Sequence, residues 1–184
     1  MRIFLVGFMG SGKTTIGKIL AEKLQYAFVD LDEVIESDLG ESIHTCFETK
    51  GELYFRQKET ICLKEIIEEN IVIATGGGTP CFNDNLSYLK ENGLLVYLNC
   101  SVDFLFYRLS AITNQRPLLK NIESEDFKNY ISETLLQRET YYKNADIIYN
   151  VISNDLTQNT TNIINEINPL IYGKQATRKT QGRK

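Results

Sequence analysis

Residues 7–14, GFMGSGKT, constrain the fold of this 184-residue chain more than any other segment. They match the pattern G-x-x-x-x-G-K-[ST] of a phosphate-binding loop, in which glycines let consecutive backbone N–H groups point at an anion. The flanks agree, because RIFLV at 2–6 predicts a buried strand and TTIGKILAEKLQ at 14–25 predicts an amphipathic helix. A chance match in such a chain arises in about one case in a hundred. The segment therefore predicts a nucleotide-phosphate site between a strand and a helix.

Individual residues of this loop have distinct expected roles at the phosphates of ATP. The Lys13 side chain can reach the β- and γ-phosphates, and the Thr14 hydroxyl can coordinate Mg²⁺. The helix that follows adds the positive end of its dipole. The residues expected to contact ATP in this loop are Gly10, Ser11, Gly12, Lys13, Thr14 and Thr15.

Short apolar runs alternate with helical segments along the rest of the chain. Strands that are apolar on both faces, each followed by a helix, indicate a parallel sheet covered by helices on both sides. We therefore expect an α/β fold, a three-layer α/β/α sandwich around a central five-stranded parallel sheet. The further strands are predicted at 27–31, 71–75, 94–98 and 145–151, and the main further helices at 51–69, 102–110, 125–142 and 155–167. A further helical pattern runs through 33–39, breaks at Gly40 and resumes from Ser42.

Two segments stand apart from this alternation. Residues 113–125 join two helices by a polar, proline-containing stretch longer than packing requires, which predicts a lid at about 112–124. The last twelve residues, GKQATRKTQGRK, carry five Lys or Arg and no acid, and their composition predicts disorder. We expect one domain over residues 1–171, followed by a basic, disordered tail at 172–184.

Asp30 and Asp32 are the only acids expected at the carboxyl end of an interior strand. In an open α/β sheet, ligands bind at the carboxyl ends of the strands. Asp30 is therefore expected beside the metal, directly or through water. Asp32 is expected beside the second substrate, where it can accept a proton from a hydroxyl group. The competing interpretation is a solvated strand end, with Asp32 as the cap of the next helix.

Two arginines and one glycine run become informative only if they converge. Arg56 and Glu59 lie three residues apart on one predicted helix face, and Arg138 precedes Glu139. Either pair alone is typical of a surface ion pair that contributes little. The run TGGGTP at 75–80 follows a predicted buried strand, and three adjacent glycines lose much conformational entropy on folding. The run is either a flexible turn or a place where the backbone lies against a ligand.

Taken in order, these motifs resemble those of the shikimate kinase family. They are GFMGSGKT, D-x-D at 30–32, FRQKE at 55–59, TGGG at 75–78, RPLL at 116–119 and R-x-x-x-Y from Arg138. The phosphate loop alone indicates an NTPase, whereas the whole set, spanning about residues 3–153, is much more specific. The resemblance implies a P-loop kinase of the nucleoside monophosphate kinase-like fold, with a lid. It also implies Mg²⁺-dependent transfer of phosphate from ATP to the 3-hydroxyl of shikimate, in aromatic amino acid biosynthesis.

The same resemblance implies a role for each matching residue. Arg56 and Arg138 would hold the carboxylate of shikimate, and Asp32 its hydroxyl groups. Arg116 of the lid would close over the phosphates, so that it both binds ATP and takes part in catalysis with Lys13 and Asp32. The remaining implied contacts are Gly76, Gly77 and Gly78 to shikimate, Arg108 and Ser153 to the adenine end of ATP, and Thr14 and Asp30 to Mg²⁺.

Charge and cysteine usage argue against several other classes of protein. Without the five basic residues of the C-terminal segment, 15 basic residues remain against 24 acidic ones, which disfavours nucleic-acid binding. No apolar run approaches the roughly 18–20 residues of a membrane span. Four separated cysteines and one histidine match no zinc pattern. We expect a cytoplasmic monomer whose partners are ATP and shikimate, with no nucleic acid and no membrane.

Three other interpretations use the same phosphate loop. A gluconate kinase or a nucleoside monophosphate kinase is the nearest, because gluconate also carries a carboxylate that Arg56 and Arg138 would suit. A GTPase-like switch requires the guanine-reading motif N-K-x-D, which does not occur in the sequence. An inactive ATP-binding interaction protein is disfavoured, because every acid and cation that the chemistry needs is present.

Overall fold

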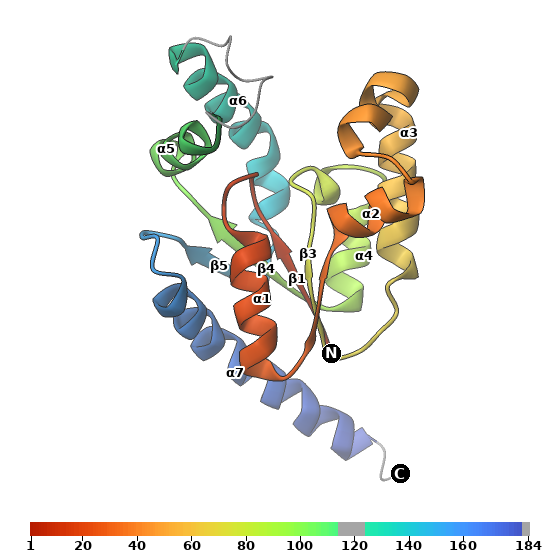
Figure 1. The fold of residues 1–184 in the computed structure, drawn as a ribbon. Coiled ribbons are helices and arrows are strands. Elements are labelled where there is room, and N and C mark those ends of the chain that lie inside the picture. The colour runs from red at the N-terminus through yellow and green to blue at the C-terminus, as the bar shows by residue number, and fades with distance from the viewer. Residues whose placement is uncertain (114–123, 182–184) are drawn as a thin grey trace.

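The computed structural model describes residues 1–113 and 124–181, the last ten of them by backbone alone. Arg116 and nearly all of the predicted lid lie outside the described residues. Five strands form one sheet between two layers of helices (Figure 1). The strands are β1 (Arg2–Val6), β2 (Ala27–Asp30), β3 (Ile71–Ala74), β4 (Leu94–Asn99) and β5 (Ile147–Asn150). The helices are α1 (Lys13–Leu24), α2 (Leu31–Leu39), α3 (Ile43–Glu65), the short 3-10 helix η1 (Thr79–Cys81), α4 (Asn85–Asn92), α5 (Val102–Thr113), α6 (Ser124–Tyr142) and α7 (Leu156–Gln181).

All five strands run parallel in the order β2-β3-β1-β4-β5, which puts β1 at the centre. Leu5 of β1 is in register with Ala74 of β3 and Val96 of β4. The predicted α/β/α sandwich with a five-stranded parallel sheet is confirmed. The prediction that β2 is an interior strand is wrong, because β2 pairs only with β3 among the described strands. Its edge position fits its partial exposure and its short apolar run, Phe28 and Val29.

Alternate residues of the strands supply two hydrophobic cores, one on each face of the sheet. In β1, Ile3 and Leu5 face one core while Phe4 and Val6 face the other, and all four are fully buried. Helices α1, α5 and α7 pack on the first face, and α2, α3 and α4 pack on the second. Helix α6 contributes to both cores, and its last residue, Tyr142, is buried in the second.

Helix α3 joins the helical pattern that starts near Ser42 to the predicted helix at 51–69, and it ends earlier than predicted, at Glu65. The Ser42 side chain caps its start by accepting a hydrogen bond from the Thr45 N–H. Gly51 interrupts the helix with a φ of 80°, a conformation that glycine adopts readily. The two halves are therefore joined by a kink. Across it, the ring centroids of Phe47 and Phe55 are 4.6 Å apart.

Helix α7 is longer than predicted and continues to Gln181. The backbone of residues 172–181 is helical, at a place where the composition of the sequence predicts a disordered tail. A physical reason lies in residues 174–181, which contain no glycine or proline and are rich in Lys, Arg, Gln and Ala, all good helix formers. The end of this helix projects beyond the rest of the chain in Figure 1. None of the described helices, α7 included, combines the length and apolar character of a membrane-spanning segment.

Candidate active site

One edge of the sheet gathers the predicted site residues, because parallel strands all end on the same side. Strand β1 leads into the phosphate loop, β2 ends at Asp30, and β3 leads into the glycine run at 75–78. Figure 1 shows the loops after β1 and β3 at the same end of the sheet. The two loops are in contact, since a Cβ atom built on Gly77 would lie 3.5 Å from the backbone nitrogen of Met9.

The phosphate loop has a backbone that only glycine adopts without strain. Gly7, Gly10 and Gly12 have positive φ values of 146°, 78° and 99°. Space is limited as well, because a Cβ on Gly10 would lie 3.0 Å from Leu109. Gly12 precedes α1 with no side-chain cap, and the first N–H groups of a helix lack intrahelical partners. The buried Ser11 hydroxyl also has no hydrogen-bond partner within the described part of the chain. The loop thus offers several unpaired donors to an anion.

Lys13 lies under this loop and is buried. Its Nζ donates to the backbone oxygens of Gly7 at 2.8 Å and Phe8 at 3.0 Å. Burial lowers the pKa of Lys13 to about 8, although the nearby carboxylates of Asp32 and Asp30 act in the opposite direction. A bound triphosphate adds negative charge beside the amine, which favours its charged form.

Thr14 and Asp30 form a pair of oxygen ligands suited to Mg²⁺. The Thr14 hydroxyl donates to Asp30 Oδ2 at 2.6 Å, and Asp30 Oδ1 accepts from the Asp32 N–H at 3.0 Å. The second bond makes Asp30, rather than Asp32, the cap of α2. Mg²⁺ is usually held by one or two protein oxygens together with phosphates and water. The residues present therefore fit this metal.

Asp32 follows at the start of α2, and its carboxylate faces the glycine run. A Cβ on Gly76 would lie 3.1 Å from Asp32 Oδ1. Although the residue as a whole is exposed, the protein atoms around its carboxylate partly desolvate it. This desolvation, followed by the negative charge of Asp30, raises the pKa of Asp32 to about 6. A carboxylate with a raised pKa is a better proton acceptor than an ordinary aspartate.

Arg56 on α3 is nearly buried, with 8% of its surface exposed. Its Nη1 donates to Glu59 Oε2 at 2.9 Å, while its Nε and Nη2 donate to Glu52 Oε1 at 3.2 and 3.1 Å. Its guanidinium lies against the glycine run, because a Cβ on Gly78 would be 2.7 Å from Arg56 Nη2. This contact and the burial of both side chains distinguish the pair from a surface ion pair and place it in the candidate site.

Arg138 on α6 approaches the same run from the other side. A Cβ on Gly77 would lie 3.2 Å from Arg138 Nη1. The Tyr142 hydroxyl, one turn further along α6, donates to the Gly77 carbonyl. Burial raises the pKa of Tyr142, so the hydroxyl stays protonated and remains a donor. Two arginines that are far apart in the sequence therefore converge on neighbouring glycines.

The glycine triplet at 76–78 is needed for space rather than for an unusual backbone. None of its members has a positive φ, in contrast to the glycines of the phosphate loop. Instead, a Cβ on any of them would meet a polar or charged side chain at 3.2 Å or less. The nearest such atoms belong to Glu59, Arg138 and Arg56. Because residues 76–78 have no side chains, there is room beside them for the side chains of Glu59, Arg138 and Arg56 as well as for a ligand.

Glu59 is a functional candidate for which the sequence indicates only an ion pair with Arg56. It is fully buried, and its two oxygens accept hydrogen bonds from Arg56 and, at 2.7 Å, from the Thr79 hydroxyl. Glu59 therefore ties α3 to the end of the glycine run. The spacing to Arg56 was visible in the sequence, but the burial and the bond to Thr79 were not.

Arg108 on α5 lies beside the start of the phosphate loop helix. A Cβ on Gly12 would be 3.3 Å from Arg108 Nη1, and Arg108 Cζ is 5.5 Å from the centroid of the Phe104 ring. The guanidinium thus borders the expected nucleotide site. The other arginine assigned to the nucleotide, Arg116, lies outside the described residues.

Ser153 lies in the loop between β5 and α7. Its backbone oxygen accepts from Asn159 Nδ2 at 2.9 Å, and Asn159 Oδ1 in turn accepts from the Tyr149 hydroxyl at 3.0 Å. Asn159 and Tyr149 are both buried. The loop that carries Ser153 is therefore anchored to the core from beneath.

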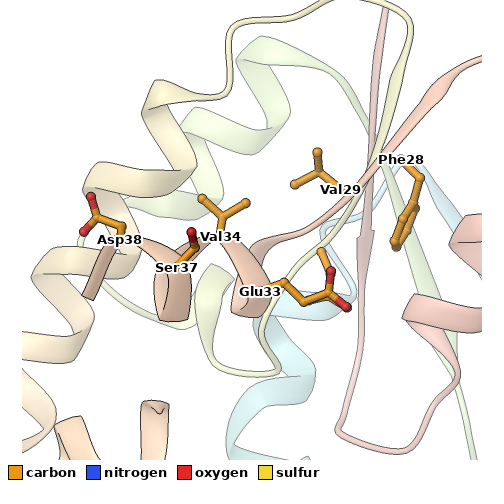
Figure 2. A pocket seen from close by; sticks show the side chains of 7 residues that line it. Phe28, Val29, Glu33, Val34, Ser37 and Asp38 are labelled. Atoms are coloured by element: carbon orange, nitrogen blue, oxygen red, sulfur yellow. The ribbon is translucent and has the colours of Figure 1, made fainter. Parts of the chain in front are cut away.

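A pocket of about 430 Å³ is lined by residues of β2 and α2 (Figure 2). Asp30 is the only predicted site residue among those that line it. Neither Lys13 nor the glycine run takes part. We therefore place the candidate site at the carboxyl edge of the sheet and not in this pocket. The lining residues are Phe28, Val29, Asp30, Glu33, Val34, Ser37 and Asp38.

A phosphate loop that faces a carboxylate and two arginines at one edge of a parallel sheet defines a P-loop kinase acting on a small acid. The family model described as shikimate kinase matches residues 9–168, and the chain belongs to the shikimate kinase family.

Individual relatives agree over most of the chain. A shikimate kinase of Azobacteroides pseudotrichonymphae genomovar. CFP2 is 44% identical over 163 residues, which cover 86% of this chain and 96% of the relative. The crystal structure of shikimate kinase from Bacteroides thetaiotaomicron superposes with a TM-score of 0.86 at 37% identity, covering 91% of this chain and 98% of the other. Shikimate kinase from Acinetobacter baumannii, solved in complex with shikimate, gives a TM-score of 0.81 at 35% identity, with 90% and 92% covered.

Proposed function

We propose that this chain transfers the γ-phosphoryl group of ATP to the 3-hydroxyl of shikimate, giving shikimate 3-phosphate and ADP. The observation that carries the proposal is the convergence of Arg56 and Arg138 on Gly78 and Gly77, beside the phosphate loop. Planar guanidinium groups suit a carboxylate. Shikimate carries a carboxylate, whereas water, the acceptor in simple ATP hydrolysis, does not. Membership of the shikimate kinase family supports this acceptor and a place in chorismate and aromatic amino acid biosynthesis.

The acceptor end of the site would orient one hydroxyl group and remove its proton. Arg56 and Arg138 bind the carboxylate of shikimate, which sets the direction of the ring. Asp32 accepts the proton of the 3-hydroxyl as the oxygen bonds to the γ-phosphorus. The bond between that phosphorus and the bridging oxygen breaks, and ADP leaves with its electron pair. Such transfer depends mainly on alignment and charge stabilisation.

The donor end would hold ATP by the loop backbone, with Lys13 turning from the carbonyls of Gly7 and Phe8 to the phosphates. Thr14 and Asp30 would hold Mg²⁺, directly or through water. When bound, the metal supplies positive charge at the β- and γ-phosphate oxygens. Arg108 would stack on the adenine, and the loop with Ser153 would face it. Arg116 would close over the phosphates as part of a lid.

Further proposals concern the state of the enzyme in the cell. We propose a monomer with no macromolecular partner, because ATP and shikimate account for all the candidate contacts. Its four cysteines are all free, which suits a reducing compartment such as the cytoplasm.

Removing Arg56 should weaken shikimate use by about 2–5 kcal/mol in kcat/KM, with the KM for ATP nearly unchanged. Arg56→Ala also leaves the buried Glu59 without its cation, so we expect a lower melting temperature. Arg56→Lys separates the two effects, because lysine retains the charge but lacks the planar pair of donors. We expect Arg56→Lys to restore stability more than shikimate use. Steady-state kinetics and thermal unfolding test this, and equal losses for both substrates would indicate a merely structural role.

Gly77→Ala should impair shikimate binding more than stability. The φ of Gly77 is compatible with alanine, but the new methyl would push Arg138 by a few tenths of an ångström. We expect the KM for shikimate to rise on the order of tenfold. Gly76→Ala is the contrasting variant, because its methyl would lie 2.8 Å from the buried Glu59 carboxylate and should lower the melting temperature. Normal shikimate kinetics in an unstable Gly77→Ala protein would support the flexible-turn interpretation instead.

The identity of the product tests the proposal. After incubation with ATP, Mg²⁺ and shikimate, ³¹P and ¹H NMR should show a phosphomonoester coupled to the proton on carbon 3. Phosphate on carbon 4 or 5 would contradict the proposed orientation of the ring. Free phosphate with unchanged shikimate would mean that the protein hydrolyses ATP without using this acceptor.

A further inference from the structure

Phe82, in the loop after η1, is the aromatic residue nearest to the Arg56 guanidinium in the described structure. Arg56 Cζ is 4.3 Å from the centroid of the Phe82 ring, compared with 5.0 Å for Phe55 and 5.9 Å for Phe47. A guanidinium is attracted to the face of an aromatic ring within about 6 Å. Phe82 therefore places its ring against the Arg56 guanidinium from a segment that does not belong to α3.

Two carboxylates accept hydrogen bonds from the same guanidinium. Glu52 accepts from Nε and Nη2, and Glu59 accepts from Nη1. Arginine has five N–H donors, so two remain, one on each Nη, without a partner among the described residues. These two donors are the ones available to a ligand carboxylate. The tilt of the guanidinium plane sets the direction in which these two donors point. The hydrogen bonds to Glu52 and Glu59 alone do not fix this tilt.

The backbone around Phe82 is anchored without the help of its ring. Asn83 Nδ2 donates to the Arg56 carbonyl at 2.9 Å and to the Thr60 hydroxyl at 3.1 Å. The Asn85 N–H donates to the Phe82 carbonyl at 3.0 Å. Phe82 is 36% exposed and belongs to neither hydrophobic core, so its ring adds little to the core. A change of side chain at position 82 should therefore leave the loop in place.

We propose that Phe82 is a positioning residue for the acceptor, and that its ring, stacked on Arg56, fixes the plane in which the guanidinium meets the shikimate carboxylate. This inference rests on the proposed function. The ring touches Arg56 rather than the reacting atoms, so Phe82 affects how well the acceptor binds and not the transfer step. An aromatic ring is required, because an aliphatic side chain of similar size offers no negative face to the cation.

Phe82→Leu and Phe82→Tyr provide the test, with Tyr54→Leu as a control. Tyr54, like Phe82, is an exposed aromatic residue, but it lies on α3 beside Lys50, whose Nζ is 5.1 Å from the centroid of the Tyr54 ring. We expect Phe82→Leu to raise the KM for shikimate about twofold to fivefold, with kcat, the KM for ATP and the melting temperature unchanged. Phe82→Tyr should keep the wild-type KM, and Tyr54→Leu should have no effect. In an Arg56→Lys background, Phe82→Leu should have a smaller effect, because lysine has no plane to orient.

Three results would overturn the inference while leaving the proposed function intact. They are an unchanged KM for shikimate in Phe82→Leu, an equal rise in Phe82→Tyr, and an equal rise in the KM for ATP. Wild-type protein that does not phosphorylate shikimate at all would overturn the proposed function and this inference together. The wild-type measurement therefore separates the two kinds of failure.

Discussion

Lys13→Ala should lower kcat by at least about a hundredfold to a thousandfold, the usual loss when one group that stabilises transition-state charge is removed. Lys13 is the only cation of the phosphate loop, and its amine lies within the loop at hydrogen-bond distance from Gly7 and Phe8. The fold should persist. Burial lowers the pKa of Lys13, which means that the folded protein disfavours the buried charge that the mutation removes. Initial rates at saturating ATP and shikimate, together with circular dichroism, measure both outcomes.

Lys23→Ala is the matched control, because Lys23 lies on the same helix but is exposed near its end. Its turnover should equal that of the unmodified protein. A Lys13→Ala protein that is folded and retains most of its turnover would show that the loop at 7–14 does not carry the phosphates.

Asp32→Asn should lower kcat by about a hundredfold to ten-thousandfold, the range expected for loss of a general base. The amide has nearly the shape of the carboxylate but cannot accept the hydroxyl proton. The bond from the Asp32 N–H to Asp30 uses only backbone atoms of residue 32, so the start of α2 should be preserved. ATP binding, measured by titration calorimetry, should therefore stay close to the wild-type value.

Glu33→Gln provides the control for this second substitution. Glu33 is the next residue of α2 but lines the pocket formed by β2 and α2, as Figure 2 shows. Its loss should leave kcat unchanged. If the Asp32→Asn enzyme kept a kcat within a few-fold of the wild-type value, Asp32 would only orient the substrate and another group would accept the proton.

The phosphate loop and the parallel sheet were predictable because their signals are local. Consecutive residues of the loop supply consecutive N–H groups, and apolar runs separated by helical segments indicate a covered parallel sheet. The convergence of strand ends likewise explains why Asp30 lies within hydrogen-bond distance of Thr14. Strand order is different, because it depends on contacts between distant segments. The position of β2 at the sheet edge could not be read from its few residues.

The contacts of the acceptor site depend on tertiary packing, and the sequence carries only part of their signal. The glycine run is evident in the sequence, but the reason for it lies in Glu59, Arg138 and Arg56, which approach from α3 and α6. Helix α3 contains, on either side of the kink at Gly51, two helical segments that the sequence pattern predicts as separate. Phe82 gave no signal, because a single aromatic residue in a loop has no period and its partner is on another element.

The most direct measurement of the central claim is ADP release in a coupled assay, with shikimate, gluconate and several nucleoside monophosphates offered in parallel at the same concentrations of ATP and Mg²⁺. We expect shikimate to exceed every other acceptor in kcat/KM by on the order of a hundredfold or more, because a polar site discriminates strongly against ligands that leave its groups unpaired. Turnover with gluconate or a nucleotide, and none with shikimate, would contradict the proposed function.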